Sequence, residues 1–355
     1  MIACTGYYDY DAGYQPAFPG ADRFAGRYVH PQHWPEDLDY TGKRVVVIGS
    51  GATAVTVVPA MAGDAARVTM LQRSPSYVFS MPSTDKVSAL LSRFLPAQWV
   101  YALGRKRNIV FIRQLYLASR RWPEPAKRLL LWLVRRRLGP GFDMRHFTPR
   151  YPPWDERMCM ASDGDLFKEI ASGRVSIVTD EIETLTETGI LLKSGQKLEA
   201  DIIVTATGLN LQMLGGMQLS VDGEACGMRD RMVYKAVLLE DIPNFAWLMG
   251  YINTPWTLKS DVAGAYLCRL SQHMDRNGYA VATPRDVEDC ATDVGVLDEL
   301  KSGYVKRAKD TMPRQGSKLP WKMLHHYEND RRILLKEPID DGVLSFSATR
   351  AEVAA

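Results

Sequence analysis

Residues 44–54 read Arg-Val-Val-Val-Ile-Gly-Ser-Gly-Ala-Thr-Ala, and this stretch decides the fold of the 355-residue chain. After the arginine come four β-branched residues, a run typical of a buried strand. The apolar positions of residues 52–61 recur at helical spacing, and a second short apolar run follows at residues 68–71. This order of strand, glycine turn, helix and strand predicts a βαβ unit in a doubly wound, Rossmann-like α/β fold.

The glycine turn matches G-x-G-x-x-A, a pattern that binds the pyrophosphate of a dinucleotide. The first glycine permits a tight turn, the second lets backbone N–H groups approach the phosphates, and the small third residue lets the helix pack on the strand. The helix N-terminus also favours an anion. We therefore expect cofactor contacts from Gly49, Ser50, Gly51, Ala52, Thr53 and Ala54.

Arg73 and Ser74 stand at the end of the second strand, where NAD-binding proteins usually carry an acid for the ribose diol. A guanidinium can pair with a 2′-phosphate, and an arginine leaves nothing to hold a bare 2′-hydroxyl. The sequence therefore favours NADP over NAD. The alternative is a structural glycine turn with a surface arginine.

Composition excludes several classes of protein. A hydrophobic fraction of 46% is that of a globular chain, and 44 basic against 41 acidic residues leave no global charge field of a nucleic-acid binder. Five cysteines without a CxxC pair disfavour a disulfide scaffold and a zinc site, and no other metal-ligand pattern is present. The longest apolar run, residues 129–134, is too short to span a membrane. We expect a cytoplasmic protein.

The rest of the chain shows three kinds of segment. Residues 1–40 are expected to be loop and connector, and residues from about 84 to 145 a basic helical insertion. Strand signals return at 175–179, 189–193 and 201–206, so we expect the parallel sheet to resume there. Later elements are expected at residues 234–239, 246–250 and 258–277, the last as one long helix.

The basic insertion allows two interpretations. Helical stretches such as Trp122 to Leu138 combine arginine with leucine and tryptophan, so they suit peripheral contact with an anionic membrane surface. They equally suit packing on the nucleotide-binding domain. We favour packing, because the apolar positions also fit helix–helix contact, and we expect no nucleic-acid partner because no recognisable binding module accompanies the charge.

A linker string precedes the nucleotide-binding strand. Residues 24–35 read Phe-Ala-Gly-Arg-Tyr-Val-His-Pro-Gln-His-Trp-Pro. Two roles are open for His30 and Trp34, which lie four residues apart: they anchor a hinge between two domains, or they are structural. The string resembles the F-x-G-x-x-x-H-x-x-x-W-P fingerprint of Baeyer-Villiger monooxygenases, a branch of the flavin-containing monooxygenases. Every defined position is present, at Phe24, Gly26, His30, Trp34 and Pro35.

The resemblance covers nearly all of the chain and is closest to the ethionamide-activating monooxygenase group. It implies a fold with two dinucleotide-binding domains, and an enzyme that uses NADPH to reduce FAD and forms a C4a-peroxyflavin with O2. One oxygen atom is then inserted beside a ketone or onto the sulfur or nitrogen of a thioether or amine. The resemblance rests also on residues 30–40, 71–75, 154–157, 201–208 and 253–258.

The resemblance also implies roles for residues and segments. Arg157 would stabilise the negatively charged flavin adduct. Thr207 and Gly208 would lie where the chain passes back from the NADP domain to the FAD domain. The expected division is residues 1–40 as the end of an FAD-domain segment with its linker, 41–207 as the NADP domain, and 208–355 as the return to the FAD and substrate domain.

One feature departs from the family. Its members open with a strand and a G-x-G-x-x-G turn for the FAD pyrophosphate, and no such motif precedes Gly49 here. We therefore expect an N-terminally truncated chain without the FAD βαβ unit. Two alternatives stay open on this ground: an NADP-linked reductase that keeps only hydride chemistry, and a catalytically impaired NADP-binding remnant.

Overall fold

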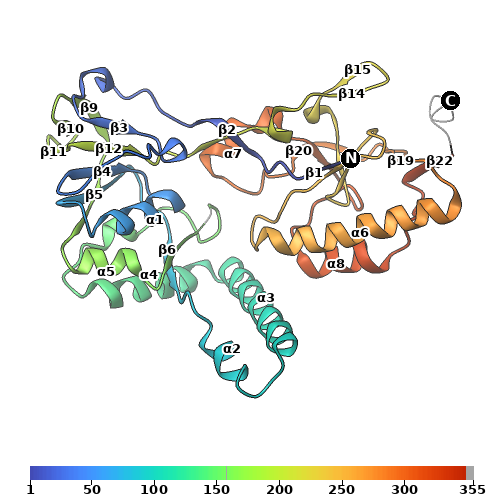
Figure 1. Cartoon of the computed structure of the whole chain (residues 1–355), viewed down its shortest axis with the longest axis horizontal. Coiled ribbons are helices and arrows are strands. Elements are labelled where there is room, and N and C mark those ends of the chain that lie inside the picture. Colours follow the sequence, from blue (N-terminus) through green and yellow to red (C-terminus); the bar gives the residue numbers. More distant parts are fainter. Residues whose placement is uncertain (157, 349–355) are drawn as a thin grey trace. The chain divides into compact units, whose positions relative to one another are not determined.

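The computed structural model describes residues 1–156 and 158–348 (Figure 1). The chain forms two compact units. Unit 1 consists of residues 1–10 together with the chain from residue 210 onward, and unit 2 consists of residues 11–209. Strands β2 (Tyr8–Gly13) and β13 (Leu209–Leu211) contain the two points at which the chain passes between the units.

Unit 2 is built on a five-stranded sheet in which every neighbouring pair is parallel. Its central strands are buried almost throughout, as expected for a parallel sheet that is covered on both faces. In spatial order the strands are β3 (Arg27–Val29), β12 (Ile202–Thr205), β4 (Arg44–Ile48), β5 (Arg67–Gln72) and β8 (Val175–Thr179).

Helices cover one face of this sheet. Val55 and Val58 of α1, Val134 of α4 and Phe167 of α5 share a core with the strand residues Val45 and Val47. Short strands β6 and β7 pair in parallel beside them. The elements are α1 (Ala52–Met61), α4 (Pro123–Leu138), α5 (Asp165–Ala171), β6 (Val78–Met81) and β7 (Cys159–Ser162).

A small antiparallel sheet covers the other face. Leu185 and Ile190 pack there against Val46 and Ile203. Residues 189–193 were expected to resume the parallel sheet, but they lie in this second layer, since the short Ser194-Gly195 turn can join only antiparallel strands. In spatial order its strands are β11 (Lys197–Glu199), β10 (Gly189–Leu192) and β9 (Ile182–Thr186).

The basic segment forms helices, as its pattern predicts. Besides α4 it contains α2 (Lys86–Leu91), α3 (Ala97–Arg121) and a short 3₁₀ helix, η3 (Met144–Phe147). In Figure 1, α2 and α3 lie at the end of unit 2 that is farthest from its parallel sheet. Within residues 1–156 and 158–348, every helix is too short or too polar to cross a membrane.

Unit 1 has its own sheet and core. The sheet order is β1 (Ile2–Ala3), β18 (Ala246–Trp247), β17 (Leu238–Leu239) and β16 (Val233–Tyr234), with β1 parallel to β18. Helices α6 (Trp256–Asn277) and α8 (Tyr327–Lys336) pack beside it. Besides short 3₁₀ helices, unit 1 also contains β14 (Leu219–Val221), β15 (Glu224–Cys226), β19 (Val281–Pro284), β20 (Ala291–Gly295), α7 (Gly303–Arg307), β21 (Arg314–Gly316) and β22 (Leu344–Ser347).

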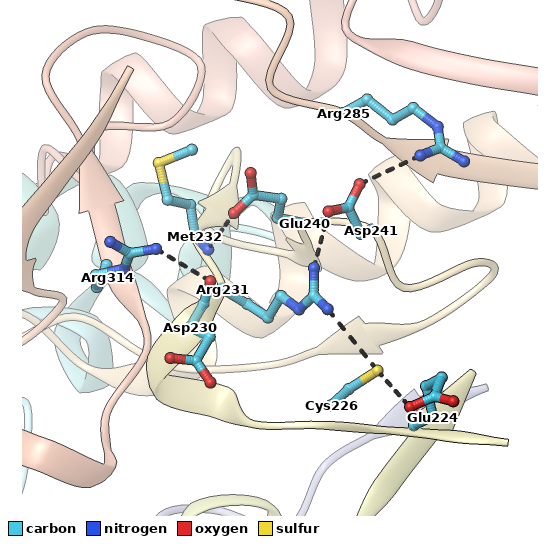
Figure 2. Close-up of polar contacts among 9 residues, drawn as sticks. All are labelled: Glu224, Cys226, Asp230, Arg231, Met232, Glu240, Asp241, Arg285 and Arg314. Atoms are coloured by element: carbon cyan, nitrogen blue, oxygen red, sulfur yellow. Dashed lines mark hydrogen bonds and ion pairs between the residues drawn. The ribbon is translucent and has the colours of Figure 1, made fainter. Parts of the chain in front are cut away.

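A polar cluster ties the β14–β15 hairpin to neighbouring segments of unit 1 (Figure 2). The Arg231 guanidinium donates to Asp241 Oδ2 at 2.8 Å and contacts Cys226 Sγ at 3.9 Å. Asp241 also pairs with Arg285 at 3.4 Å. All of these contacts lie within unit 1, so we interpret the cluster as structural: it fixes the hairpin to the chain that follows it.

Two expectations about organisation differ from the structure. Residues 234–239 were expected as one strand, but Lys235 and Ala236 have positive φ and form the turn between β16 and β17. The buried Lys235 ammonium lies 2.8 Å from Asp341, a partner that no local pattern reveals. The first boundary between units follows residue 10 rather than residue 40, because β3 pairs with β12 and Trp34 packs on the core of unit 2.

Candidate dinucleotide site and linker

The turn between β4 and α1 has the geometry of a phosphate-binding turn. Gly49 has a φ of +145°, and a Cβ there would lie 2.2 Å from the carbonyl oxygen of Ala206, so only glycine fits. A Cβ on Gly51 would meet nothing within 4 Å, so the space beside this residue is open. No side chain caps the N-terminus of α1, which leaves its first N–H groups available to an anion.

Ser50 joins this turn to the loop that follows β5. Its hydroxyl lies 3.0 Å from the carbonyl oxygen of Ser74 and 3.0 Å from the hydroxyl of Ser76. Beneath the turn, the thiol of Cys159 donates to the carbonyl oxygen of Ser50 at 3.7 Å. Burial raises the pKa of Cys159 to about 11, which keeps this sulfur a protonated donor at neutral pH.

Arg73 and Ser74 are exposed at the carboxyl end of β5, next to the glycine turn in the sheet. The preceding residue, Gln72, is buried, and its amide donates to the carbonyl oxygen of His146 at 2.7 Å and to Thr179 Oγ1 at 2.8 Å. The base of the loop is therefore fixed while the arginine faces solvent. The nearby Lys193, and to a smaller extent Arg73, lower the pKa of the Glu181 carboxyl.

These features fit NADP. An open glycine turn and an uncapped helix N-terminus suit a pyrophosphate, and an exposed guanidinium after the second strand suits a 2′-phosphate. A second strand, glycine turn and helix of this kind, which would suit the pyrophosphate of FAD, does not occur among residues 1–156 and 158–348. The described residues therefore hold one dinucleotide turn. Nor do they contain a group of three His, Cys, Asp or Glu side chains placed to hold a metal.

His30 connects the linker to both crossing segments. Its buried ring lies with Nε2 3.2 Å from the carbonyl oxygen of Gly208, while Nδ1 accepts from the backbone N–H of Gln32 at 3.3 Å. A carbonyl oxygen only accepts, so Nε2 carries the hydrogen and the ring is neutral. Burial lowers the pKa of His30, in agreement with this state. A Cβ on Gly13 would lie 1.9 Å from the ring.

Thr207 and Gly208 meet the outgoing segment at the same place. The backbone N–H of Tyr14 donates to the carbonyl oxygen of Gly208 at 3.0 Å, and Thr207 Oγ1 donates to the carbonyl oxygen of Tyr14 at 2.6 Å. The predicted pair is thus next to the two crossing points between the units. Sequence reasoning missed Gly13 and Tyr14, because neither belongs to a recognisable motif.

The other fingerprint residues are dispersed through unit 2. A Cβ on Gly26 would lie 2.3 Å from the carbonyl oxygen of Asp201, so glycine is needed where β3 begins beside β12. Phe24 packs on the core under the antiparallel sheet, whereas Trp34 packs on the core under the helices. Pro35 accepts a turn bond from Leu38. The fingerprint shapes the linker and does not form one pocket.

Arg157 lies outside the described residues, so its proposed role in catalysis stays a prediction. Two residues before it in the chain, the largely buried carboxylate of Asp155 pairs with Arg120 of α3 at 2.7 Å.

Comparison with known proteins matches these observations to one family. The model of the family described as "Flavin-binding monooxygenase-like" matches residues 1–221. MymA of Mycobacterium tuberculosis (strain ATCC 25618 / H37Rv), named as an FAD-containing monooxygenase, is 67% identical over all of this chain and 72% of its own length. The chain belongs to the flavin-binding monooxygenase-like family. The expected class of enzyme, a flavin-dependent monooxygenase, is therefore confirmed.

Other family members and solved structures agree. The FAD-containing monooxygenase EthA of Mycobacterium tuberculosis (strain ATCC 25618 / H37Rv) is 46% identical over 99% of this chain and 72% of its own length. A steroid monooxygenase bound to NADP covers 98% of this chain with a TM-score of 0.68 and 20% identity, over 75% of its own chain. An open structure of cyclohexanone monooxygenase gives the same TM-score at 17% identity, over 98% of this chain and 74% of its own. These likenesses confirm the fold class.

Proposed function

We propose that this chain is an NADPH- and FAD-dependent monooxygenase that inserts one oxygen atom from O2 into a ketone or onto a sulfur or nitrogen atom. Family membership supports the oxygenation. The choice of NADPH is supported by one observation, the exposed Arg73 that follows β5 beside the open Gly49 turn. FAD, when bound, would activate O2 for the oxygenation, and NADPH would supply the hydride that reduces the flavin.

In this proposal unit 2 is the NADP domain, and its residues bind and orient the nucleotide. The backbone N–H groups of residues 51–54 face the pyrophosphate, and Arg73 pairs with the 2′-phosphate. Ser50 links the glycine turn to the loop after β5, because its hydroxyl donates to the carbonyl oxygen of Ser74. His30 and Thr207 hold the linker segments at the edge of the unit.

The nucleotide assignment is tested with Arg73→Ala. Loss of a charge-assisted hydrogen bond should weaken NADPH binding by about 1 to 3 kcal/mol, which is roughly fivefold to 150-fold, and leave NADH binding nearly unchanged. Titration calorimetry on the full chain measures both affinities without turnover. Arg67→Ala is the matched control, because Arg67 is also exposed but begins β5 at the opposite end. Equal losses for both nucleotides would refute the assignment.

The reaction is tested with FAD, NADPH and isotopically labelled O2, offering a cyclic ketone and a thioether in parallel. The proposal expects one labelled oxygen atom in an ester or a sulfoxide. NADPH oxidation without any need for O2 would indicate a reductase. NADPH binding without turnover, with FAD supplied, would indicate a nucleotide-binding remnant.

A further inference from the structure

The positive charge of the chain is concentrated in one place. Residues 86–138, which contain α2, α3 and α4 and are called the basic arm below, include 13 lysines and arginines and a single acid, Glu124. The arm therefore has a net charge of +12, and the remaining residues together have a net charge of −9. The overall charge of +3 conceals this separation.

The basic arm also exposes apolar side chains. Of the 22 large apolar side chains that are exposed within residues 1–156 and 158–348, 14 lie between Val87 and Leu133. Phe94, in the loop before α3, is 78% exposed, and Trp99 near the start of α3 is 60% exposed. The surfaces of soluble proteins usually carry exposed apolar residues singly, so a cluster of 14 indicates an interaction surface.

On α3 the exposed apolar residues form a stripe. Trp99, Leu103, Val110 and Leu117 are spaced by four, seven and seven residues, which places them within about 40° of one another around the helix. The buried Val100 and Gly104 lie on a different face. Lys106 borders the stripe, where its long stem can lie along the apolar surface with its ammonium at the edge.

Helix α4 also has one buried and one exposed apolar face. Leu130 and Val134 are buried, and Val134 belongs to the core of unit 2. Leu129, Trp132 and Leu133 are exposed beside them. The guanidinium of Arg136 lies over the Trp132 ring at 5.6 Å. Packing on unit 2 therefore accounts for one apolar face of the helix and leaves the second without a partner in the described residues.

The net charge of +12 on the basic arm favours an anionic partner. We propose that the basic arm binds the surface of an anionic phospholipid bilayer, with α3 lying flat and its stripe among the headgroups. Apolar and aromatic side chains with flanking lysine and arginine are the combination that holds a helix at such an interface. A second copy that met this face symmetrically would bring +12 against +12. The inference is independent of the NADP assignment.

Flotation of the full chain with vesicles tests the proposal. Vesicles of phosphatidylcholine with about one-third phosphatidylglycerol should bind at least roughly tenfold more tightly than phosphatidylcholine alone, and added salt should weaken the binding. Trp99→Ser should reduce it severalfold. Tyr101→Ser, which removes another exposed aromatic of α3 from outside the stripe, should leave it unchanged.

A charge-reversal pair provides a second test. Lys106→Glu places an acid at the border of the stripe and should weaken binding, whereas Lys197→Glu makes the same change on the exposed strand β11 and should not. Far-ultraviolet circular dichroism checks that each variant is folded. Equal binding to neutral vesicles, or equal losses in the control variants, would overturn the proposal. So would a dimer that dissociates on Leu103→Ser, since a second copy would then cover the stripe.

Discussion

Gly26 has room for a hydrogen atom and nothing larger. Gly26→Ala would place a methyl group 2.3 Å from the Asp201 carbonyl oxygen and 2.6 Å from the Phe24 ring. Because the first neighbour is backbone directly before the central strand β12, the strain should lower the free energy of unfolding by about 2 kcal/mol or more. Urea denaturation measures the change. Gly63→Ala is the control, since its Cβ would meet nothing within 4 Å, and equal effects would contradict this account.

Single residues differ in how well the sequence reveals them. Gly49, Arg73 and the five fingerprint residues could be singled out because each stands at a fixed spacing from a strand or from another motif residue. Gly13 could not. Its role comes from the His30 ring, which occupies the place of its Cβ although the two residues are 17 positions apart. A contact of this kind appears only once the chain is folded.

At the scale of elements, Asp201 joins two central strands of unit 2. Its carboxylate, just before β12, accepts from the backbone N–H of Arg44 at 2.8 Å and from the Arg44 side chain at 2.7 and 3.1 Å. These hydrogen bonds lower the pKa of Asp201 to about 2. A carboxyl whose pKa is lower when folded stabilises the protein above its unfolded pKa, and this contribution fades as the pH falls toward 2.

Asp201→Asn should therefore cost stability in a pH-dependent way. At pH 6 we expect the variant to be less stable than the parent by about 1 kcal/mol, since the pair is partly exposed. Near pH 3 the difference should be smaller. Urea midpoints of both proteins at the two pH values give the measurement, and a difference that grows at low pH would contradict the assignment.

Elements were predictable where the signal is local. The strands at 44–48 and 175–179 have the expected bounds because each is a short run of β-branched or apolar residues. The segment 189–193 is a strand, but its apolar pattern cannot say which sheet it joins. Residues 234–239 break at Lys235, whose partner Asp341 lies 106 positions away. Local patterns identify elements, and distant partners decide their arrangement.

At the scale of the whole molecule, unit 1 depends on a buried ion pair. The ammonium of Lys259 on α6 lies 2.7 Å from Asp330 of α8, and both side chains are largely inaccessible to solvent. Burial lowers the pKa of Lys259, although Asp330 opposes this change. The hydroxyl of Tyr251 donates to the same carboxylate at 2.9 Å. The ion pair therefore links the two helices, and each buried charge is compensated by the other.

Asp330→Ala should destabilise unit 1 by about 3 to 5 kcal/mol, because it leaves the Lys259 charge buried without a counterion. Amide hydrogen exchange should accelerate in α6 and α8, while β4 and β5 of unit 2 serve as an internal reference. Replacing both partners, Lys259→Met with Asp330→Leu, should restore most of the protection. Unchanged exchange in α6 and α8 would show that the pair does not stabilise the unit.

The division into units was only partly predictable. The chain returns to unit 1 after residue 209, close to the Ala-Thr-Gly segment at residues 206–208 that the sequence singles out. That this segment separates an NADP domain from an FAD domain stays a prediction. The outgoing crossing was misplaced, since residues 11–40 have little periodicity and only the pairing of β3 with β12 assigns them to unit 2.

The separation of charge along the chain has a consequence for its isoelectric point. The sequence gives an isoelectric point of about 8.5, but lysine and arginine keep their protons well above that pH, so the basic arm remains strongly positive there. The balance at this pH comes from acids elsewhere in the sequence. Bringing the solution to the isoelectric point therefore leaves the attraction of these helices for anions intact, whereas salt weakens it.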